Sequence, residues 1–158
     1  TPGVETPITD TSSGEEPGTE PVMMDLANPS TYVADGAGVE PTYDSASGCL
    51  NVVVPQYQGI ILKVPDNGKT YKNMKVTYTS DSQISAYLFD GAMTTGIGQT
   101  APGQHEVAGG LEAAAQEKTA EFKVASGYKD DCLKAIKFVH VDTNTASKNI
   151  SIKSIELS

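Results

Sequence analysis

Turn-forming residues punctuate this chain at short intervals from residue 22 onward, and their spacing is the feature that most restricts its fold. The turn signals are Asn28-Pro29, Asp35-Gly36, Ser47-Gly48, Asp66-Asn67-Gly68, Asp81-Ser82, Asp90-Gly91, Pro102-Gly103, Gly109-Gly110, Ser126-Gly127 and Thr143-Asn144. Between them lie runs rich in Val, Ile, Thr and Tyr, clearest at residues 50–54, 59–64, 71–79, 84–89, 104–107, 120–124, 136–141 and 150–157. Short strands at this spacing predict an all-β fold, an antiparallel two-sheet jelly-roll β-sandwich. Only residues 111–118 (LEAAAQEK) resemble a helix, and their length predicts a single short helix or a turn on a loop.

Composition divides the chain into a tether and one domain. Residues 1–21 are rich in Pro, Gly, Thr, Ser and Glu and hold five carboxylates and no lysine, so we interpret them as an acidic linker. The sandwich is predicted at 22–158, a length that suits one domain with a proper core. The chain has no apolar run of membrane-spanning length and no signal-peptide pattern at its start, so we expect it to be part of a larger protein.

The charge of the chain disfavours two classes of partner. All the basic residues are lysines and the formal net charge is −9, which argues against nucleic acid and against an anionic membrane surface. The linker carries five of the negative charges, and this leaves a formal charge of −4 on residues 22–158. Cys49 and Cys132 are the only cysteines, too few for a disulfide framework and without zinc-site spacing, so either a bridge or two free thiols is compatible with the sequence.

The segment Ile136-Lys-Phe-Val-His-Val-Asp142 is the first candidate for a ligand surface. As a strand it puts Phe138, His140 and Asp142 on one face and the two valines on the other. An aromatic ring, an imidazole and a carboxylate about 6 to 7 Å apart would suit a sugar unit. The alternative is a solvated face with one incidental ring.

Alternation also sorts the faces of other predicted strands. In residues 84–90 the core set is Ile84, Ala86 and Leu88, and the opposite face carries Ser85, Tyr87 and Phe89. In residues 74–79 the sets are Met74, Val76 and Tyr78 against Lys75, Thr77 and Thr79. In the last strand Ile150, Ile152 and Ile155 are available for the core, and Lys153-Ser154 breaks the alternation and predicts a bulge.

Several segments resemble the jelly-roll carbohydrate-binding modules attached to xylanases, most of all families 22 and 4. The segments are Gly48-Cys-Leu-Asn-Val-Val-Val, Tyr57-Gln-Gly59, Ile61-Leu-Lys-Val, Asn67-Gly-Lys-Thr-Tyr-Lys-Asn-Met-Lys-Val-Thr-Tyr and the closing residues 136–157. The resemblance covers most of residues 22–158. It implies a β-sandwich that binds xylan or related β-glycans in a cleft on its concave face, without catalysis. It also implies a secreted or bacterial cell-surface setting, with the module tethered to a glycoside hydrolase.

The resemblance assigns roles to particular residues. Tyr57 stands at the family's cleft aromatic, followed by Gln58 and Gly59, while Phe138 and Asp142 fill the aromatic and acidic places of the penultimate strand. His140 lies between these two, where family members often have Tyr. The chain has no Trp, so stacking would depend on Tyr57, Tyr87, Phe89 and Phe138, each of which could instead belong to the core. With Gln58, His140 and Asp142 as hydroxyl partners, these four rings complete the predicted carbohydrate-binding set.

Other functions remain alternatives. An H-x-D pair could begin a metal site, but it needs a further ligand, and only His105 and scattered carboxylates are available. The final strand has Ile-Lys-Ser-Ile where the family commonly has an Ile-Asp-Asp type pair near a structural calcium, so we expect no cofactor, with a structural calcium as the less favoured alternative. No G-x-S-x-G, H-E-x-x-H, P-loop or G-x-G-x-x-G motif is present, which argues against a self-standing enzyme. We expect a monomeric glycan-binding module, and the alternative is a structural or adhesin-type sandwich that makes protein contacts.

Overall fold

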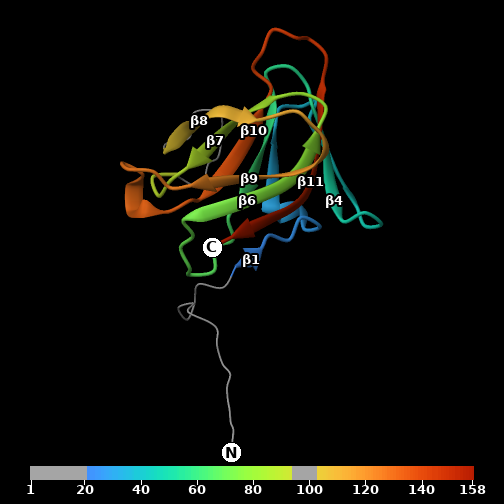
Figure 1. The fold of residues 1–158 in the computed structure, drawn as a ribbon. Coiled ribbons are helices and arrows are strands. Elements are labelled where there is room, and N and C mark those ends of the chain that lie inside the picture. Colours follow the sequence, from blue (N-terminus) through green and yellow to red (C-terminus); the bar gives the residue numbers. More distant parts are fainter. Residues whose placement is uncertain (1–20, 94–102) are drawn as a thin grey trace, which may run out of the picture.

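Residues 21–93 and 103–158 form two antiparallel β-sheets packed face to face in the computed structural model (Figure 1). Residues 1–20 of the predicted linker lie outside the described part of the chain. The strands of the first sheet are β1 (Val22–Met23), β3 (Glu40–Asp44), β4 (Cys49–Val54), β6 (Asn73–Ser80), β9 (Ala114–Lys123) and β11 (Lys148–Leu157). Those of the second sheet are β2 (Tyr32–Asp35), β5 (Gly59–Lys63), β7 (Ile84–Phe89), β8 (Gln104–Leu111) and β10 (Ala135–Val139). Within these residues the only helical turns are the 3-10 pieces η2 (Pro29–Thr31) and η3 (Lys129–Asp131).

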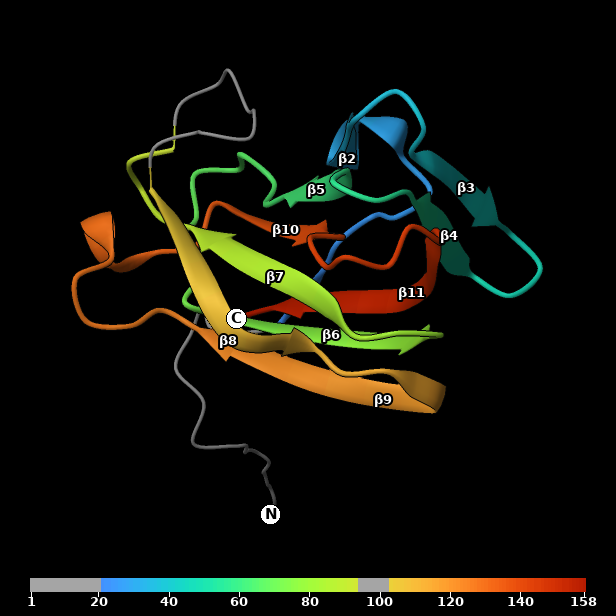
Figure 2. The same ribbon diagram turned by 90° about the horizontal axis from the view of Figure 1, so that it is seen from above.

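The strand order gives the jelly-roll arrangement that the turn spacing predicts. The first sheet runs β3-β4-β11-β6-β9, with β1 also paired to β11, and the second runs β2-β5-β10-β7-β8. From β4 to β7 the chain changes sheet at each connection, and it changes again between β8 and β9, β9 and β10, and β10 and β11. Figure 2 shows the two layers, with β5, β10 and β7 in one and β11, β6 and β9 in the other.

The core lies between the sheets and follows the alternation of each strand. Its inward side chains from the second sheet are Ile60, Leu62, Ile84, Ala86, Leu88, Ile136 and Phe138. Those from the first sheet include Leu50, Val52, Met74, Val76, Tyr78, Ile150, Ile152 and Ile155. The predicted sorting of β6, β7 and β11 is therefore confirmed, and the register shift between Ile152 and Ser154 is the predicted bulge.

Residues 111–118 do not form the predicted helix or loop. β8 continues to Leu111, and β9 begins at Ala114 and pairs with β6 from Ser80 to Asn73. The alanine-rich segment has high helix propensity, but antiparallel pairing and a side-chain hydrogen bond between Thr77 and Thr119 hold it extended.

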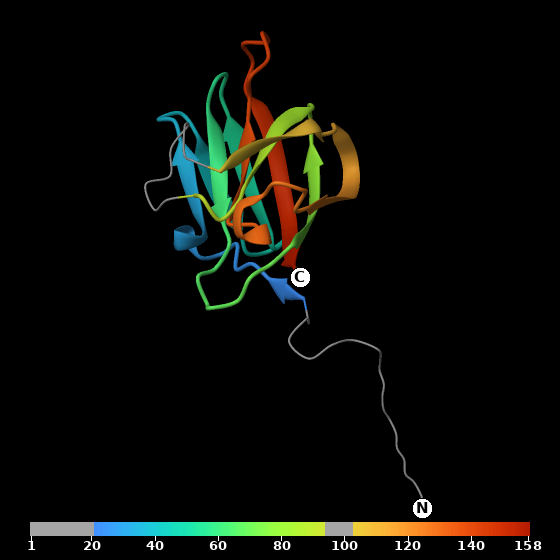
Figure 3. The ribbon, with the colours of Figure 1, turned by 90° about the vertical axis from the view of Figure 1, so that its left-hand side faces the viewer.

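Two connections meet at one end of the sandwich. The connection from β4 to β5 and the connection from β10 to β11 project side by side (Figures 1 and 3), joined by a hydrogen bond from Gln56 Nε2 to the Asp142 carbonyl at 3.0 Å. The β5–β6 connection lies at the opposite end of the molecule. In the described part of the chain, no helix has the length and apolar character to cross a membrane.

Candidate functional site

Tyr57 occupies a tight turn and a bulge at the start of β5. The Gln58 amide donates to the Pro55 carbonyl at 3.1 Å, and Tyr57 has a φ of 63°, which is the pattern of a type II turn. The Tyr57 amide donates to the His140 carbonyl at 2.6 Å, and the His140 amide donates to the Gln58 carbonyl at 3.0 Å. Tyr57 and Gln58 therefore lie opposite a single residue, His140, of the neighbouring chain segment, as in a G1-type bulge.

The backbone of Tyr57 is strained, and its ring faces solvent. A bulge of this type normally places glycine at its left-handed position, because a Cβ atom there costs roughly 1–2 kcal/mol. Tyr57 nevertheless keeps that conformation, and its side chain is 67% exposed. Strain of this kind persists where the surrounding structure imposes it and often marks a functional position. Tyr57 is therefore the strongest candidate for a ligand-contacting ring.

The two residues after Tyr57, Gln58 and Gly59, have structural roles. The Gln58 side chain accepts a hydrogen bond from the Gly38 amide at 2.8 Å, and this ties the β4–β5 connection to the β2–β3 turn. A Cβ atom at Gly59 would lie 2.5 Å from the Phe138 carbonyl oxygen, so only glycine fits there. The side-chain oxygen of Gln58 is thus engaged by the protein, and the contact of Gln58 with a sugar hydroxyl stays a prediction.

Asp142 lies beside this turn and is held by a buried lysine. The Lys148 ammonium donates to the Asp142 carboxylate and to the Gln83 carbonyl. The hydrogen bond from Lys148 holds the pKa of Asp142 below its usual value. The Asp142 side chain remains 48% exposed, so its oxygens are accessible to a ligand next to Tyr57.

Three residues of the predicted site are in the interior. Phe138 is fully buried among the core side chains between the sheets, and His140, also fully buried, forms a hydrogen bond from Nε2 to the Ala146 carbonyl at 2.9 Å. Phe89 does point to the outer face of the second sheet, but it is fully buried in a small cluster with Ile61 and Ala135. Placing Phe138, His140 and Asp142 on one ligand-facing surface was therefore wrong.

β7 and β10 are neighbours in one sheet, as the predicted cleft requires, but Tyr87 and Phe138 lie on opposite faces of it. Tyr87 is half-buried and pairs with Lys137, whereas Phe138 pairs with Ala86. The outer face of β10 therefore carries Ala135, Lys137 and Val139 in place of the predicted row. Of the predicted residues, Tyr57 and Tyr87 have exposed or half-exposed side chains. Asp142 also stays half-exposed, although its carboxylate accepts hydrogen bonds from Lys148 and from the Asn144 amide.

Sequence reasoning missed a buried ion pair on the same outer face. Lys137 Nζ lies 3.0 Å from Asp35 Oδ2, and the side chains are 5% and 12% exposed. The pair joins β10 to β2 across β5 and lies next to Tyr87 in the register. The only sequence signal was a lysine inside an otherwise apolar strand, because its partner lies 102 positions earlier in the chain.

A second polar cluster lies at the far end of β7. Asp90 accepts hydrogen bonds from the Ala92 amide at 2.8 Å and the Lys129 amide at 2.9 Å, and its other contact is His105 Nε2 at 2.7 Å. Burial by itself would raise the pKa of Asp90, but the contacts with His105 and the two amides outweigh it and lower that pKa. His105 also stacks on Tyr128 at 3.9 Å between ring centroids. With its carboxylate saturated in this way, the cluster is suited to holding loops together.

Neither a metal centre nor a thiol site emerges from the described residues. Residues 21–93 and 103–158 contain no group of three or more His, Cys, Asp or Glu side chains arranged to hold a metal ion. Cys49 and Cys132 are both free, so they form no bridge with one another. Burial raises the pKa of the Cys132 thiol, which makes it a poor nucleophile at neutral pH.

Comparison with known proteins finds structural neighbours only. No protein-family model and no curated protein sequence matches the chain. A family 29 carbohydrate-binding module is 12% identical, with a TM-score of 0.60 over 87% of this chain and 88% of the other. An aspartate-to-alanine mutant of such a module in complex with mannohexaose is 15% identical, with a TM-score of 0.60 over 87% and 90%. The family 11 module from Clostridium thermocellum in complex with a β-1,3-1,4-mixed-linked tetrasaccharide is 14% identical, with a TM-score of 0.54 over 87% and 94%.

These likenesses establish the fold, the β-sandwich of carbohydrate-binding modules. The neighbours belong to families 29 and 11, whereas the sequence resemblance is to families 22 and 4 of xylanase-associated modules. The comparisons therefore support the sandwich architecture at the level shared by all these modules.

Proposed function

We propose that this protein is a non-catalytic module that binds a β-linked glycan, with xylan or xylo-oligosaccharides as the expected ligand. The contact surface is the end of the second sheet where Tyr57 projects, with Asp142 beside it and Tyr87 farther along the outer face. In this proposal the module is a monomer that directs an attached glycoside hydrolase, a xylanase, to its substrate outside the cell or on a bacterial surface.

One observation carries the proposal: Tyr57 holds an exposed ring on a strained backbone. A pyranose ring has an apolar C–H face that stacks on a flat aromatic ring, and a rim of hydroxyls that needs acceptors and donors. Asp142 supplies a carboxylate whose hydrogen bonds to neutral hydroxyls are shorter and stronger than neutral ones. The described structural neighbours include modules in complex with mannohexaose and with a mixed-linked tetrasaccharide, which agrees with a glycan ligand for this fold.

A protein-contact function has one observation in its favour. Val141 is 47% exposed and follows His140, whose carbonyl accepts a hydrogen bond from the Tyr57 amide, so two exposed apolar side chains lie on neighbouring segments at this end of the sandwich. Such a surface suits a structural or adhesin-type domain as well as a sugar. The ligand experiment decides between the two functions.

The test is binding to insoluble xylan followed by calorimetric titration with xylohexaose. We expect the wild-type protein to be retained by xylan, and Tyr57→Ala to weaken the titration about 10- to 100-fold. Met23→Ala is the matched control, because Met23 is an exposed apolar side chain on β1 of the other sheet. Absence of binding to xylan, mannan and mixed-linkage glucan would leave the protein-contact function as the better explanation.

A further inference from the structure

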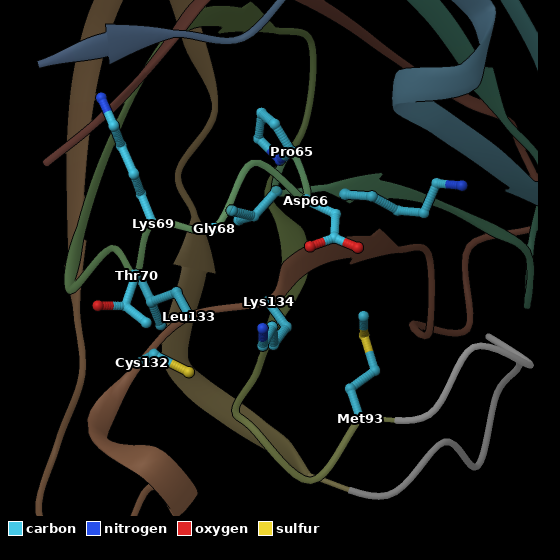
Figure 4. Close-up of a pocket in the computed structure, with 11 residues that line it drawn as sticks. Pro65, Asp66, Gly68, Lys69, Thr70, Met93, Cys132, Leu133 and Lys134 are labelled. Carbon is cyan, nitrogen blue, oxygen red and sulfur yellow. The ribbon is translucent and has the colours of Figure 1, made fainter.

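A hollow of about 510 Å³ lies at the opposite end of the second sheet from Tyr57. Its walls come from the end of β5 and the β5–β6 connection, from Met93, and from the segment that precedes β10 (Figure 4). The volume falls within the range of small-molecule sites, roughly 300–1,000 Å³. The hollow could therefore accommodate a sugar unit.

The charge of this hollow is opposite to that of the protein. Lys63, Lys69 and Lys134 contribute to its lining, and Asp66 is the only acidic residue among the lining residues. The chain as a whole has 20 acidic residues against 11 lysines. Figure 4 shows the Asp66 carboxylate toward the middle of the hollow, so it can offset at most one of the three positive charges.

These three lysines have no acidic partners within the described residues. Five other lysines form ion pairs, namely Lys72, Lys118, Lys137, Lys148 and Lys153. Six lysines form no ion pair in the described part of the chain, and three of those six line this one hollow. Figure 4 shows the Lys69 ammonium pointing away from Asp66 and Lys134, so Lys69 adds to the positive potential around the hollow without facing its centre. A bound anion would offset this unbalanced positive charge.

The hollow belongs to the same face as the proposed glycan surface. Lys63 pairs with Ala135, which pairs with Phe89, and Met93 packs on the outer-face cluster that contains these last two residues. Met93 also lines the hollow. Lys63 lies six positions after Tyr57 along the bulge and β5, a span of roughly 20 Å at the rise of an extended strand. An oligosaccharide of several units could reach from one end of the face to the other.

We propose that the hollow is a second subsite, which binds the carboxylate of a uronic acid carried by the glycan. This inference rests on the proposed function and narrows its ligand to acidic glycans, such as xylan with glucuronic acid side groups. Lys63 and Lys134 attract the carboxylate, and the half-buried side chains of Met93 and Pro65 provide apolar contact for the sugar ring. Cys132 takes no chemical part, because burial raises its pKa and keeps the thiol protonated.

The test compares a xylo-oligosaccharide that carries one glucuronic acid group with a neutral one of the same backbone length. We expect the acidic ligand to bind about 3- to 10-fold more tightly at low salt, because an exposed charge pair contributes about two- to five-fold. The preference should disappear in the double variant Lys63→Gln/Lys134→Gln and shrink at 1 M salt, where screening is strong. Asp66→Asn should strengthen it. Lys123→Gln, at an exposed and unpaired lysine on β9, should leave it unchanged.

Each outcome separates this inference from the proposed function. Equal affinity for the two ligands, or an acidic preference that survives the double variant, overturns the subsite while neutral binding through Tyr57 stands. If the wild-type protein binds the glucuronic acid-bearing ligand but not the neutral one, and the double variant loses that binding, the subsite is supported and the role of Tyr57 is overturned. A sulfated xylo-oligosaccharide that binds as tightly as the uronate would show recognition of any anion and overturn the assignment to a carboxylate. No binding of any of these ligands overturns both proposals.

Discussion

Replacing Tyr57 by glycine and by alanine separates the role of its ring from the strain of its backbone. Both variants remove the ring, and only glycine accepts a φ of 63° without the steric cost of a Cβ atom. That cost is roughly 1–2 kcal/mol, and the greater freedom of glycine in the unfolded chain returns about 0.5–1 kcal/mol of it. Tyr57→Gly should therefore be more stable than Tyr57→Ala by up to about 1 kcal/mol, or about 2 to 5 °C in melting temperature for a domain of this size.

Binding should respond differently from stability. Both variants lose the stacking surface, so xylohexaose affinity should fall in both by about 1.5–3 kcal/mol, or roughly 10- to 100-fold. The free energy of unfolding of Tyr57→Ala should lie within about 0.5 kcal/mol of the wild-type value, since the lost side chain is 67% exposed. Tyr57→Phe keeps the ring and should bind within a few-fold of the wild type.

Thermal melts and calorimetry of the three variants give the answer. A glycine variant less stable than the alanine variant would refute the argument from strain. Wild-type affinity in both Tyr57→Gly and Tyr57→Ala would show that Tyr57 is not part of the site. A marked loss of stability in Tyr57→Ala would show that the ring packs against the rest of the domain.

Three further predictions follow from buried or charged contacts. Phe138→Ala should lose about 3–5 kcal/mol of stability by chemical denaturation, while Phe138→Leu, still folded, should bind xylohexaose like the wild type. Asp90→Asn should cost about 1–3 kcal/mol at pH 7. The pKa of Asp90 is lower in the folded protein, so its stabilising contribution is present above the unfolded pKa of about 4 and is lost as the pH falls through the folded pKa. The melting temperatures of variant and wild type should therefore converge as the pH is lowered below about 4. Asp142→Ala should weaken xylohexaose binding roughly 10- to 100-fold. It should also lower the melting temperature, because it leaves the Lys148 ammonium without its carboxylate; wild-type affinity and melting temperature would contradict this role of the Asp142–Lys148 pair.

Local signals in the sequence were sufficient for the sandwich. Turn residues separate the strands, and apolar alternation in Ile84–Phe89 assigns both faces of β7 correctly. The Lys153-Ser154 pair located the bulge of β11, because two successive polar residues cannot both keep an alternating pattern. β1, β2 and β3 were missed, since they are short or contain Pro and acidic residues that weaken the strand signal.

Alternation could not show which face of β10 points inward, because Lys137 on one face and His140, just after the strand, on the other are both polar. His140 turns inward, where the Ala146 carbonyl satisfies its Nε2, and Lys137 stays outward, where Asp35 neutralises it. Each partner is fixed by the folded chain, and neither is visible in the local pattern. Burial of such groups is tolerable only with these partners.

The main chain of His140 explains how a misassigned residue still contributes to the candidate site. Its ring is buried, but its carbonyl and amide are the two groups that bind Tyr57 and Gln58 and close the bulge. Substitutions of the imidazole should therefore act on the site through the position of the β10 backbone, whereas substitutions of the Tyr57 ring act on the ligand directly. The sequence could single out Tyr57 from its aromatic-x-Gly setting, but the left-handed conformation that exposes its ring depends on this long-range pairing. Strain and exposure together, rather than residue type alone, distinguish Tyr57 from the buried aromatics of the same sheet.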